Sequence, residues 1–205
     1  MFFFLGLSLI VVGIGCLSID RQAAHFFYDA GSHGFHRFLD STTHWAKAGH
    51  WLAGALIALI GVNLALFWTD NAVLDVITQC ALAFIACLAF GSIILHAIKL
   101  VLGRRRPRDD MEMGLYGFVP FAFNLEYNSF PSGHALTIMC VAVVASCVWP
   151  HLIILWFAIA AWLALTRAFL TAHFLSDVFI GAGIGLAVSH IVLRIWFPVL
   201  AQAWV

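Results

Sequence analysis

The stretch Arg167-Ala-Phe-Leu-Thr-Ala-His173-Phe-Leu-Ser-Asp177 places an arginine, a histidine and an aspartate between two apolar runs. His173 and Asp177 are four residues apart, so on a helix they would share one face. Asp177 would then accept a proton from one imidazole nitrogen and leave the other nitrogen of His173 free to attack. Arg167 adds a planar group suited to a phosphate or a carboxylate. The pattern indicates a nucleophilic site, with an interfacial anchor at a helix end as the alternative.

The composition of the whole chain is typical of a membrane protein. Of its 205 residues, 63% are hydrophobic and 10% are charged, whereas a soluble domain carries about 25% charged residues. Ten lysines and arginines balance ten aspartates and glutamates, so nucleic acid is not an expected partner. The five cysteines lie within apolar runs without a CxxC pair and are expected to be buried thiols. We expect a single domain over residues 1–205.

Six apolar runs come near the length of about 20 residues that a membrane-spanning helix needs. They predict an all-α fold in which six transmembrane helices form one bundle. The predicted spans are 2–18, 51–68, 73–102, 132–150, 152–169 and 176–196. A polar and aromatic segment, 20–49, is predicted to hold an interfacial helix between the first two spans. The first run lacks a basic start and an A-x-A cleavage site, so we expect it to be retained.

The alternation of the spans brings the polar motifs to one end of this bundle. The third span ends and the fourth begins on the side where the fifth ends and the sixth begins. The segment 20–49 meets this side too, whereas both termini lie on the other. Of the ten lysines and arginines, only Arg194 belongs to the opposite side. By charge alone, the basic side would face the cytoplasm.

A basic motif, Lys99-Leu-Val-Leu-Gly-Arg-Arg-Arg106-Pro107, ends the third span. Lys99 and Arg106 are about two helical turns apart and therefore lie on one face. Pro107 biases Arg106 away from helical backbone and ends the span there. The alternative is a basic cluster that anchors the helix at the membrane edge. That is our interpretation of the other arginines in segment 104–108.

A second motif, Pro131-Ser132-Gly133-His134, begins the fourth span. A helix N-terminus offers free N–H groups and the positive end of a dipole, which suits an anion. Gly133 lets a phosphate approach the backbone closely, Ser132 offers a further hydrogen bond, and His134 is placed to give or take a proton. The alternative is an ordinary helix start with a Pro/Ser cap.

Together the motifs gather three cations, backbone donors, two histidines and one carboxylate. The residues are Lys99, Arg106, Ser132, Gly133, His134, Arg167, His173 and Asp177. Such a set suits phosphoryl transfer, in which cations neutralise the phosphate oxygens, one histidine attacks phosphorus and the other protonates the departing oxygen. We predict no metal, because a carboxylate cluster for Mg²⁺ is lacking and the acidic group at 109–112 is interpreted as a solvated loop.

The succession K-x6-R-P, P-S-G-H and R-x5-H-x3-D over residues 99–177 resembles the type-2 phosphatidic acid phosphatase superfamily. The resemblance implies a membrane lipid phosphatase with His173 as nucleophile, Asp177 as its orienting carboxylate and His134 as general acid. It implies that the phosphate is bound by Lys99, Arg106, Ser132, Gly133 and Arg167. The family works without a metal or other cofactor. It usually has serine before the third-motif arginine, where this chain keeps a hydroxyl with Thr166.

The expected substrate is a lipid phosphate or diphosphate such as undecaprenyl diphosphate, phosphatidylglycerol phosphate, phosphatidic acid or a lipid A phosphate. The expected partners are this lipid and the bilayer, with no obligate protein partner. By the resemblance, the protein lies in a bacterial inner membrane with its site facing the periplasm, against the charge count. The alternatives are a polytopic transporter and an inactive protein that binds lipid phosphates. The deepest polar groups, His96 and His190, are interpreted as satisfied within the bundle.

Overall fold

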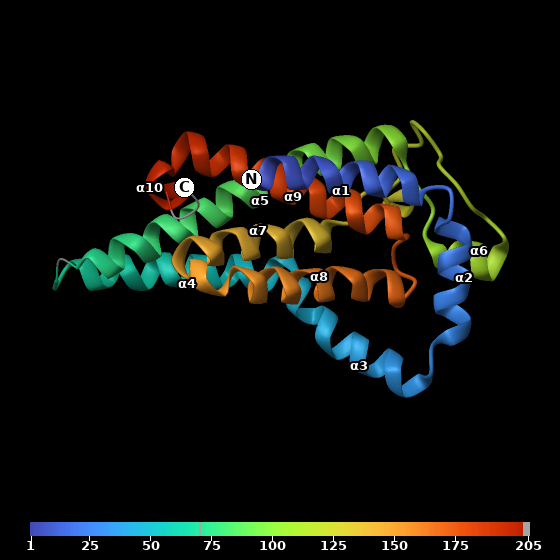
Figure 1. The fold of residues 1–205 in the computed structure, drawn as a ribbon, viewed down its shortest axis with the longest axis horizontal. Coiled ribbons are helices and arrows are strands. Elements are labelled where there is room, and N and C mark those ends of the chain that lie inside the picture. Colours follow the sequence, from blue (N-terminus) through green and yellow to red (C-terminus); the bar gives the residue numbers. More distant parts are fainter. Residues whose placement is uncertain (70, 203–205) are drawn as a thin grey trace.

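The fold is an elongated helical bundle (Figure 1). The computed structural model describes residues 1–69 and 71–202, and no strand is formed within these ranges beyond isolated bridges at Arg104. The α-helices are α1 (Phe2–Cys16), α2 (Asp20–Ala30), α3 (His33–Thr43), α4 (Ala48–Leu66), α5 (Ala72–Leu102), α6 (Pro107–Met113), α7 (Gly133–Val148), α8 (Ile153–Phe169), α9 (Leu175–Trp196) and α10 (Pro198–Ala201). Short 3-10 helices are η1 (His44–Ala46), η2 (Leu125–Tyr127) and η3 (Pro150–Leu152).

Several helices have the length and apolar composition to cross a membrane. Four segments meet both conditions by themselves, namely Gly34–Leu66, Ala72–Leu102, Pro150–Phe169 and Leu175–Trp196. The pair α1 and α2, bent by 83°, meets them only when counted together, and α7 is apolar but shorter. Each of the six predicted runs coincides to within a few residues with a helix of the bundle. The predicted all-α fold is confirmed.

Helix α9 is the central element of the bundle, packing against α1, α5, α7 and α8. Its glycines allow very close helix approach. A Cβ on Gly183 would lie 2.6 Å from the carbonyl oxygen of Gly6 in α1, and one on Gly181 would lie 2.3 Å from that of Ser132. The start of α9 is thereby held against the residue that precedes α7, which brings two of the sequence motifs together.

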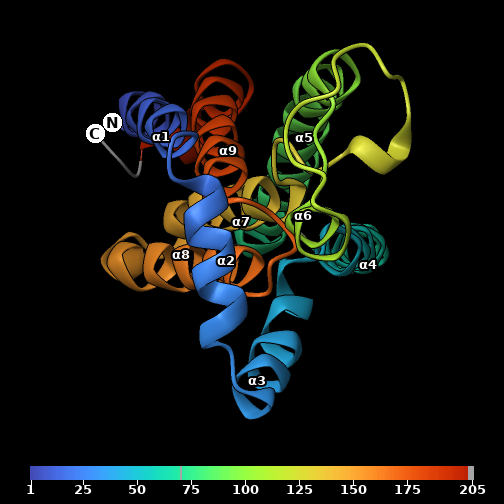
Figure 2. The same cartoon turned by 90° about the vertical axis from the view of Figure 1, so that its right-hand side faces the viewer.

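The polar segments meet at one end of the bundle, as predicted. Helix α2 crosses this end, and α6 lies beside it (Figures 1 and 2). Asp110 of α6 accepts hydrogen bonds from Arg21 Nε (3.0 Å) and Nη2 (2.9 Å) and lies 3.0 Å from His25 Nε2. The acidic group is therefore not a solvated loop: it forms α6, and Asp110 is only 4% exposed. Segment 20–49 contains two helices, α2 and α3, rather than one.

Candidate active site

His173 lies in the loop between α8 and α9. Helix α8 ends at Phe169, and Thr171 then adopts a positive φ of 51°. The chain turns back so that the N–H groups of Ala172 and His173 both donate to the carbonyl oxygen of Arg167, at 3.0 and 3.1 Å. Because α9 begins only at Leu175, the prediction that His173 and Asp177 share a helix face was wrong. Their proximity comes from this turn instead.

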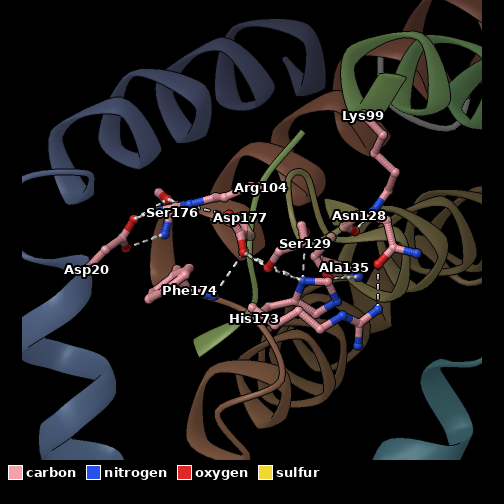
Figure 3. A network of polar contacts seen from close by, with 12 residues as sticks. Asp20, Lys99, Arg104, Asn128, Ser129, Ala135, His173, Phe174, Ser176 and Asp177 are labelled. Atoms are coloured by element: carbon pink, nitrogen blue, oxygen red, sulfur yellow. Dashed lines mark hydrogen bonds and ion pairs between the residues drawn. The ribbon is translucent and has the colours of Figure 1, made fainter. Parts of the chain in front are cut away.

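The imidazole of His173 is held on one side by Ser129 (Figure 3). Nδ1 lies 2.8 Å from the carbonyl oxygen of Ser129 and 3.6 Å from Oδ2 of Asp177. Since a carbonyl oxygen only accepts, Nδ1 carries the proton and Nε2 of the neutral ring keeps its lone pair. The nearest acceptor of the ring is therefore Ser129, where the sequence had suggested Asp177.

Asp177 is fully buried and its carboxylate is surrounded by donors. Oδ2 accepts from the backbone N–H of Phe174 at 2.9 Å and from Ser129 Oγ at 2.6 Å. Oδ1 accepts from Arg104 Nη1 at 2.6 Å. Because these donors satisfy the carboxylate, it also fixes Ser129, whose carbonyl oxygen in turn fixes the ring of His173.

A cavity of about 610 Å³ opens beside His173. Its charged and imidazole lining consists of Lys47, Lys99, Arg106, Arg167, His96, His134 and His173, and none of its described lining residues carries a carboxylate. Apolar side chains of α5 and α7, among them Leu88, Leu95 and Leu136, complete the wall. His96 therefore faces this cavity, whereas the sequence had suggested a histidine satisfied inside the bundle. The cavity combines a basic end with an apolar wall.

The three predicted phosphate-binding cations contact neutral groups. Lys99 Nζ donates to the carbonyl oxygen of Asn128, and Arg106 Nη2 donates to Asn128 Oδ1 at 2.7 Å. Arg167 Nη1 donates to Thr43 Oγ1 at 3.3 Å, and its buried Nε has no partner among the described residues. None of these three side chains forms an ion pair with a carboxylate of the described ranges, which suits the binding of an anion.

The start of α7 supplies two more groups to the cavity. Gly133 and His134 line it, and a Cβ added to Gly133 would meet nothing within 4 Å. Ser132 lies behind them, fully buried, where its N–H donates to the carbonyl oxygen of Asp177 at 2.9 Å and its Oγ accepts from Ala135 N at 3.5 Å. The geometry leaves room for a ligand against the backbone of Gly133, whereas Ser132 acts as the cap of α7.

The environment of His173 favours the neutral ring. Burial lowers its pKa from the ordinary value, and the nearby charges of Arg167 and Lys99 lower it further, against an opposing effect of Asp177. Burial also lowers the pKa of Arg106, with a smaller contribution from Arg108. A neutral imidazole with an exposed lone pair on Nε2 is the form that attacks phosphorus.

Several residues at the site carried no distinctive signal in the sequence. Ser129 and Asn128 precede the Pro-Ser-Gly-His motif and gain importance only through contacts far along the chain. Arg104 was assigned to an anchoring cluster, yet it is fully buried. Thr166 donates to Leu163 O at 2.7 Å, and its Oγ1 lies 3.1 Å from Thr43 Oγ1, so its hydroxyl supports Thr43, the contact of Arg167. Three or more His, Cys, Asp or Glu side chains placed to hold a metal ion are not found in the described ranges.

Known proteins are similar to this chain in part of its sequence or in its fold. The lipid A 1-phosphatases of Rhizobium etli and Rhizobium johnstonii are each 32% identical to the chain over 96 residues, which is 47% of the chain and 41% and 39% of their own lengths. A transmembrane PAP2 type phosphatidylglycerolphosphate phosphatase from Bacillus subtilis has a similar crystal structure, with a TM-score of 0.61. That similarity covers 94% of this chain and 92% of the other at 20% identity, so the two share a fold.

The family itself is identified by the segment that contains the site. A model of the PAP2 superfamily matches residues 80–200, which is more than half of the chain. The match includes the basic motif that begins in the last turn of α5, the start of α7 and the loop that carries His173. The chain belongs to the PAP2 superfamily.

Proposed function

We propose that the protein is an integral membrane phosphatase that hydrolyses a lipid phosphate or diphosphate through a phosphohistidine intermediate. The observation that carries this proposal is the cavity in which Lys99, Arg106 and Arg167 lie without carboxylate partners beside the imidazole of His173. The membership of the chain in the PAP2 superfamily and the phosphatase activities of the similar proteins support it.

In the first step, Nε2 of His173 attacks phosphorus and the bond from phosphorus to the lipid oxygen breaks. The departing oxygen takes a proton from His134, which stands at the start of α7 and lines the same cavity. The three cations stabilise the negative charge on the phosphoryl oxygens in the transition state. The carbonyl oxygen of Ser129 accepts a hydrogen bond from Nδ1–H and keeps the ring in the orientation for attack. The products are the dephosphorylated lipid and a phosphohistidine.

In the second step, water attacks the phosphohistidine and the bond from phosphorus to Nε2 breaks. His134, now neutral, accepts a proton from this water and returns to its starting state. Inorganic phosphate leaves, and His173 regains its lone pair. The N–H groups at the start of α7 and the open space above Gly133 accommodate the phosphoryl group in both steps.

Among the expected substrates, we propose a lipid A phosphate as the first to test. The two curated relatives are lipid A 1-phosphatases, although the match covers less than half of each. The structurally similar Bacillus subtilis protein is a phosphatidylglycerolphosphate phosphatase, which keeps that lipid as the second candidate. The apolar side of the cavity, formed by Leu88, Leu95 and Leu136, suits the chain-bearing part of either lipid.

We further propose that six helices cross the membrane, namely α1, α4, α5, α7, α8 and α9, and that α2 lies along the interface. The support is the amphipathic composition of α2 and its angle of 83° to α1. The proposed location is a bacterial inner membrane with the cavity facing the periplasm, so that lipid phosphates reach it at the outer leaflet. Labelling of a single cysteine introduced at the exposed Trp68 by a membrane-impermeant maleimide tests the orientation, since α4 ends away from the cavity.

The proposed activity is tested with purified protein in detergent. Release of inorganic phosphate is measured from lipid A, phosphatidylglycerol phosphate, phosphatidic acid and undecaprenyl diphosphate. We expect turnover of at least one lipid, and an acid-labile phosphohistidine when labelled substrate is quenched rapidly. Lipid binding without turnover on any of the four would instead support an inactive lipid-phosphate-binding protein.

A further inference from the structure

A buried cluster of charges adjoins Asp177, which lies between it and the proposed nucleophile (Figure 3). None of the residues of this cluster lines the cavity. Its centre is Arg104, which is fully buried, with Cζ 4.2 Å from the ring centroid of Phe174 and 4.7 Å from that of Phe118. Nη1 donates to Asp177 Oδ1 at 2.6 Å and Nη2 donates to Asp20 Oδ2 at 2.8 Å. One arginine thus joins two carboxylates that lie far apart in the sequence.

The second carboxylate, Asp20, comes from the first residue of α2. It is fully buried. Its Oδ1 accepts the backbone N–H of Ser176 at 3.0 Å, and its Oδ2 accepts the hydroxyl of Ser176. Arg104 Nη1 also donates to Ser176 Oγ at 2.7 Å. Asp20 therefore ties α2 both to Arg104 and to the residue that precedes Asp177.

Charges this deeply buried are expensive unless they are paired and hydrogen-bonded. Surface anchoring does not require this arrangement, because Arg108, in the same basic segment, stays exposed beside Asp109. The cluster has a geometric consequence as well. It fixes Oδ1 of Asp177, so that Oδ2 faces Ser129, and Ser129 holds Nδ1 of His173.

We propose that Arg104 and Asp20 are positioning residues for His173, acting through Asp177 and Ser129, so that α2 forms part of the catalytic apparatus. The inference rests on the proposed phosphatase function and adds two residues that its sequence motifs do not specify. Neither side chain lines the cavity, so neither touches the substrate. Their effect is on the orientation of the ring and on the proton at Nδ1.

A positioning role predicts a specific change in the pH dependence of the rate. The charged and titratable groups beside His173 are Asp177 from α9, Arg167 from α8, Lys99 from α5 and His134 from α7. Without Arg104, the charge of Asp177 is no longer balanced by the guanidinium, so the carboxylate holds a proton on His173 more strongly. The neutral ring then forms only at higher pH than in the wild type, and the acid limb of the rate profile moves upward.

The test compares Arg104→Gln, Arg104→Lys and Asp20→Asn with the control Arg108→Gln, on the lipid that the wild type hydrolyses fastest. We expect kcat to fall about 100-fold for Arg104→Gln, as for a misplaced reacting group, and less for Asp20→Asn. The KM should change little, and the acid limb should move to higher pH. Arg104→Lys keeps the charge without the two-pronged geometry and should recover part of kcat. Arg108→Gln should match the wild type in all respects.

Folding is checked by gel filtration in detergent and by the inhibition constant of inorganic phosphate, which depends on the untouched cavity cations. If Arg104→Gln does not fold, the kcat and the acid limb of Asp20→Asn and Arg104→Lys test the positioning role instead. Folded variants with the kcat and acid limb of Arg108→Gln would overturn the inference while leaving the phosphatase function standing. A wild-type protein that releases phosphate from no lipid refutes the proposed function, and this inference falls with it.

Discussion

The two sides of the His173 imidazole differ in how their charges are balanced. On the cavity side, Lys99, Arg106 and Arg167 contact only neutral groups within the described ranges. On the buried side, Arg104 forms ion pairs with Asp177 at 2.6 Å and with Asp20 at 2.8 Å. Within the described residues, the cations on the cavity side thus form no ion pair, whereas the arginine on the buried side is paired with two carboxylates.

This difference indicates where a ligand supplies the missing charge. A buried or half-buried cation without a carboxylate is unfavourable until an anion arrives. On the buried side, the protein supplies both the positive and the negative charges. That region therefore orients the His173 ring and does not bind substrate. The same residue type therefore has two functions: Arg106 lines the cavity and contacts an amide oxygen, whereas the fully buried Arg104 contacts carboxylates.

The largest expected effect comes from the ring that separates the two sides. His173→Ala removes the proposed nucleophile and should lower kcat by at least about 10³-fold, as in other enzymes that lose a covalent nucleophile. Phosphate release and quench trapping of labelled phosphohistidine measure this. The matched control is His151→Ala, an exposed histidine in η3 at the other end of the bundle. Near-normal turnover by a well-folded His173→Ala protein would refute the assignment.

A smaller effect is expected on the cavity side from His134. A general acid contributes about 10²–10⁴-fold, and most of that is needed when the leaving group is a poor one, such as a lipid alkoxide. The aryl oxygen of p-nitrophenyl phosphate needs little protonation. His134→Ala should therefore lose a larger factor on the lipid than on the aryl ester, whereas His173→Ala should lose similar factors on both. Equal losses for His134→Ala would indicate that it only binds phosphate.

The pH dependence sharpens the comparison further, because the protonation of His173 depends on the charges on both of its sides. His173 must be neutral to attack, and burial with the charges of Arg167 and Lys99 lowers its pKa from the ordinary value, against the opposing effect of Asp177. The rate should thus rise with pH along an acid limb centred below about 6.5. A profile of kcat/KM against pH measures this limb. An acid limb centred above the ordinary histidine value would contradict the environment of His173.

The sequence predicted the cavity side far better than the buried side. Apolar runs located the helices, because about 20 apolar residues suffice to define a span whatever surrounds it. Motif spacing and span direction together predicted that the polar motifs meet at one end of the bundle. The cavity at that end is lined by five of the predicted residues, namely Lys99, Arg106, Gly133, His134 and Arg167. The clamp of Arg21 on Asp110 was missed, since nothing local marks a contact across 89 residues.

Arg104 shows why the buried side could not be predicted. It stands in a run of arginines, and composition and spacing give it the same interpretation as Arg105 and Arg108. Its burial depends on Asp20 and Asp177, which lie 84 and 73 residues away. The turn that places His173 in the loop before α9 could not be predicted either. The four-residue spacing to Asp177 fits two positions on one helix equally well.

The smallest expected effect is that of removing metal ions. It tests whether the cations on the cavity side neutralise the phosphate without a metal. In many phosphatases a bound cation neutralises the phosphoryl oxygens and activates water. Here Lys99, Arg106 and Arg167 are proposed to supply that charge, and His134 to activate the water. Dialysis against EDTA should therefore leave kcat and KM unchanged, within the error of the phosphate-release assay. A magnesium-dependent phosphatase treated in parallel shows that chelation was complete. Loss of turnover in EDTA that Mg²⁺ restores would mean that the three cations alone do not balance the transition state.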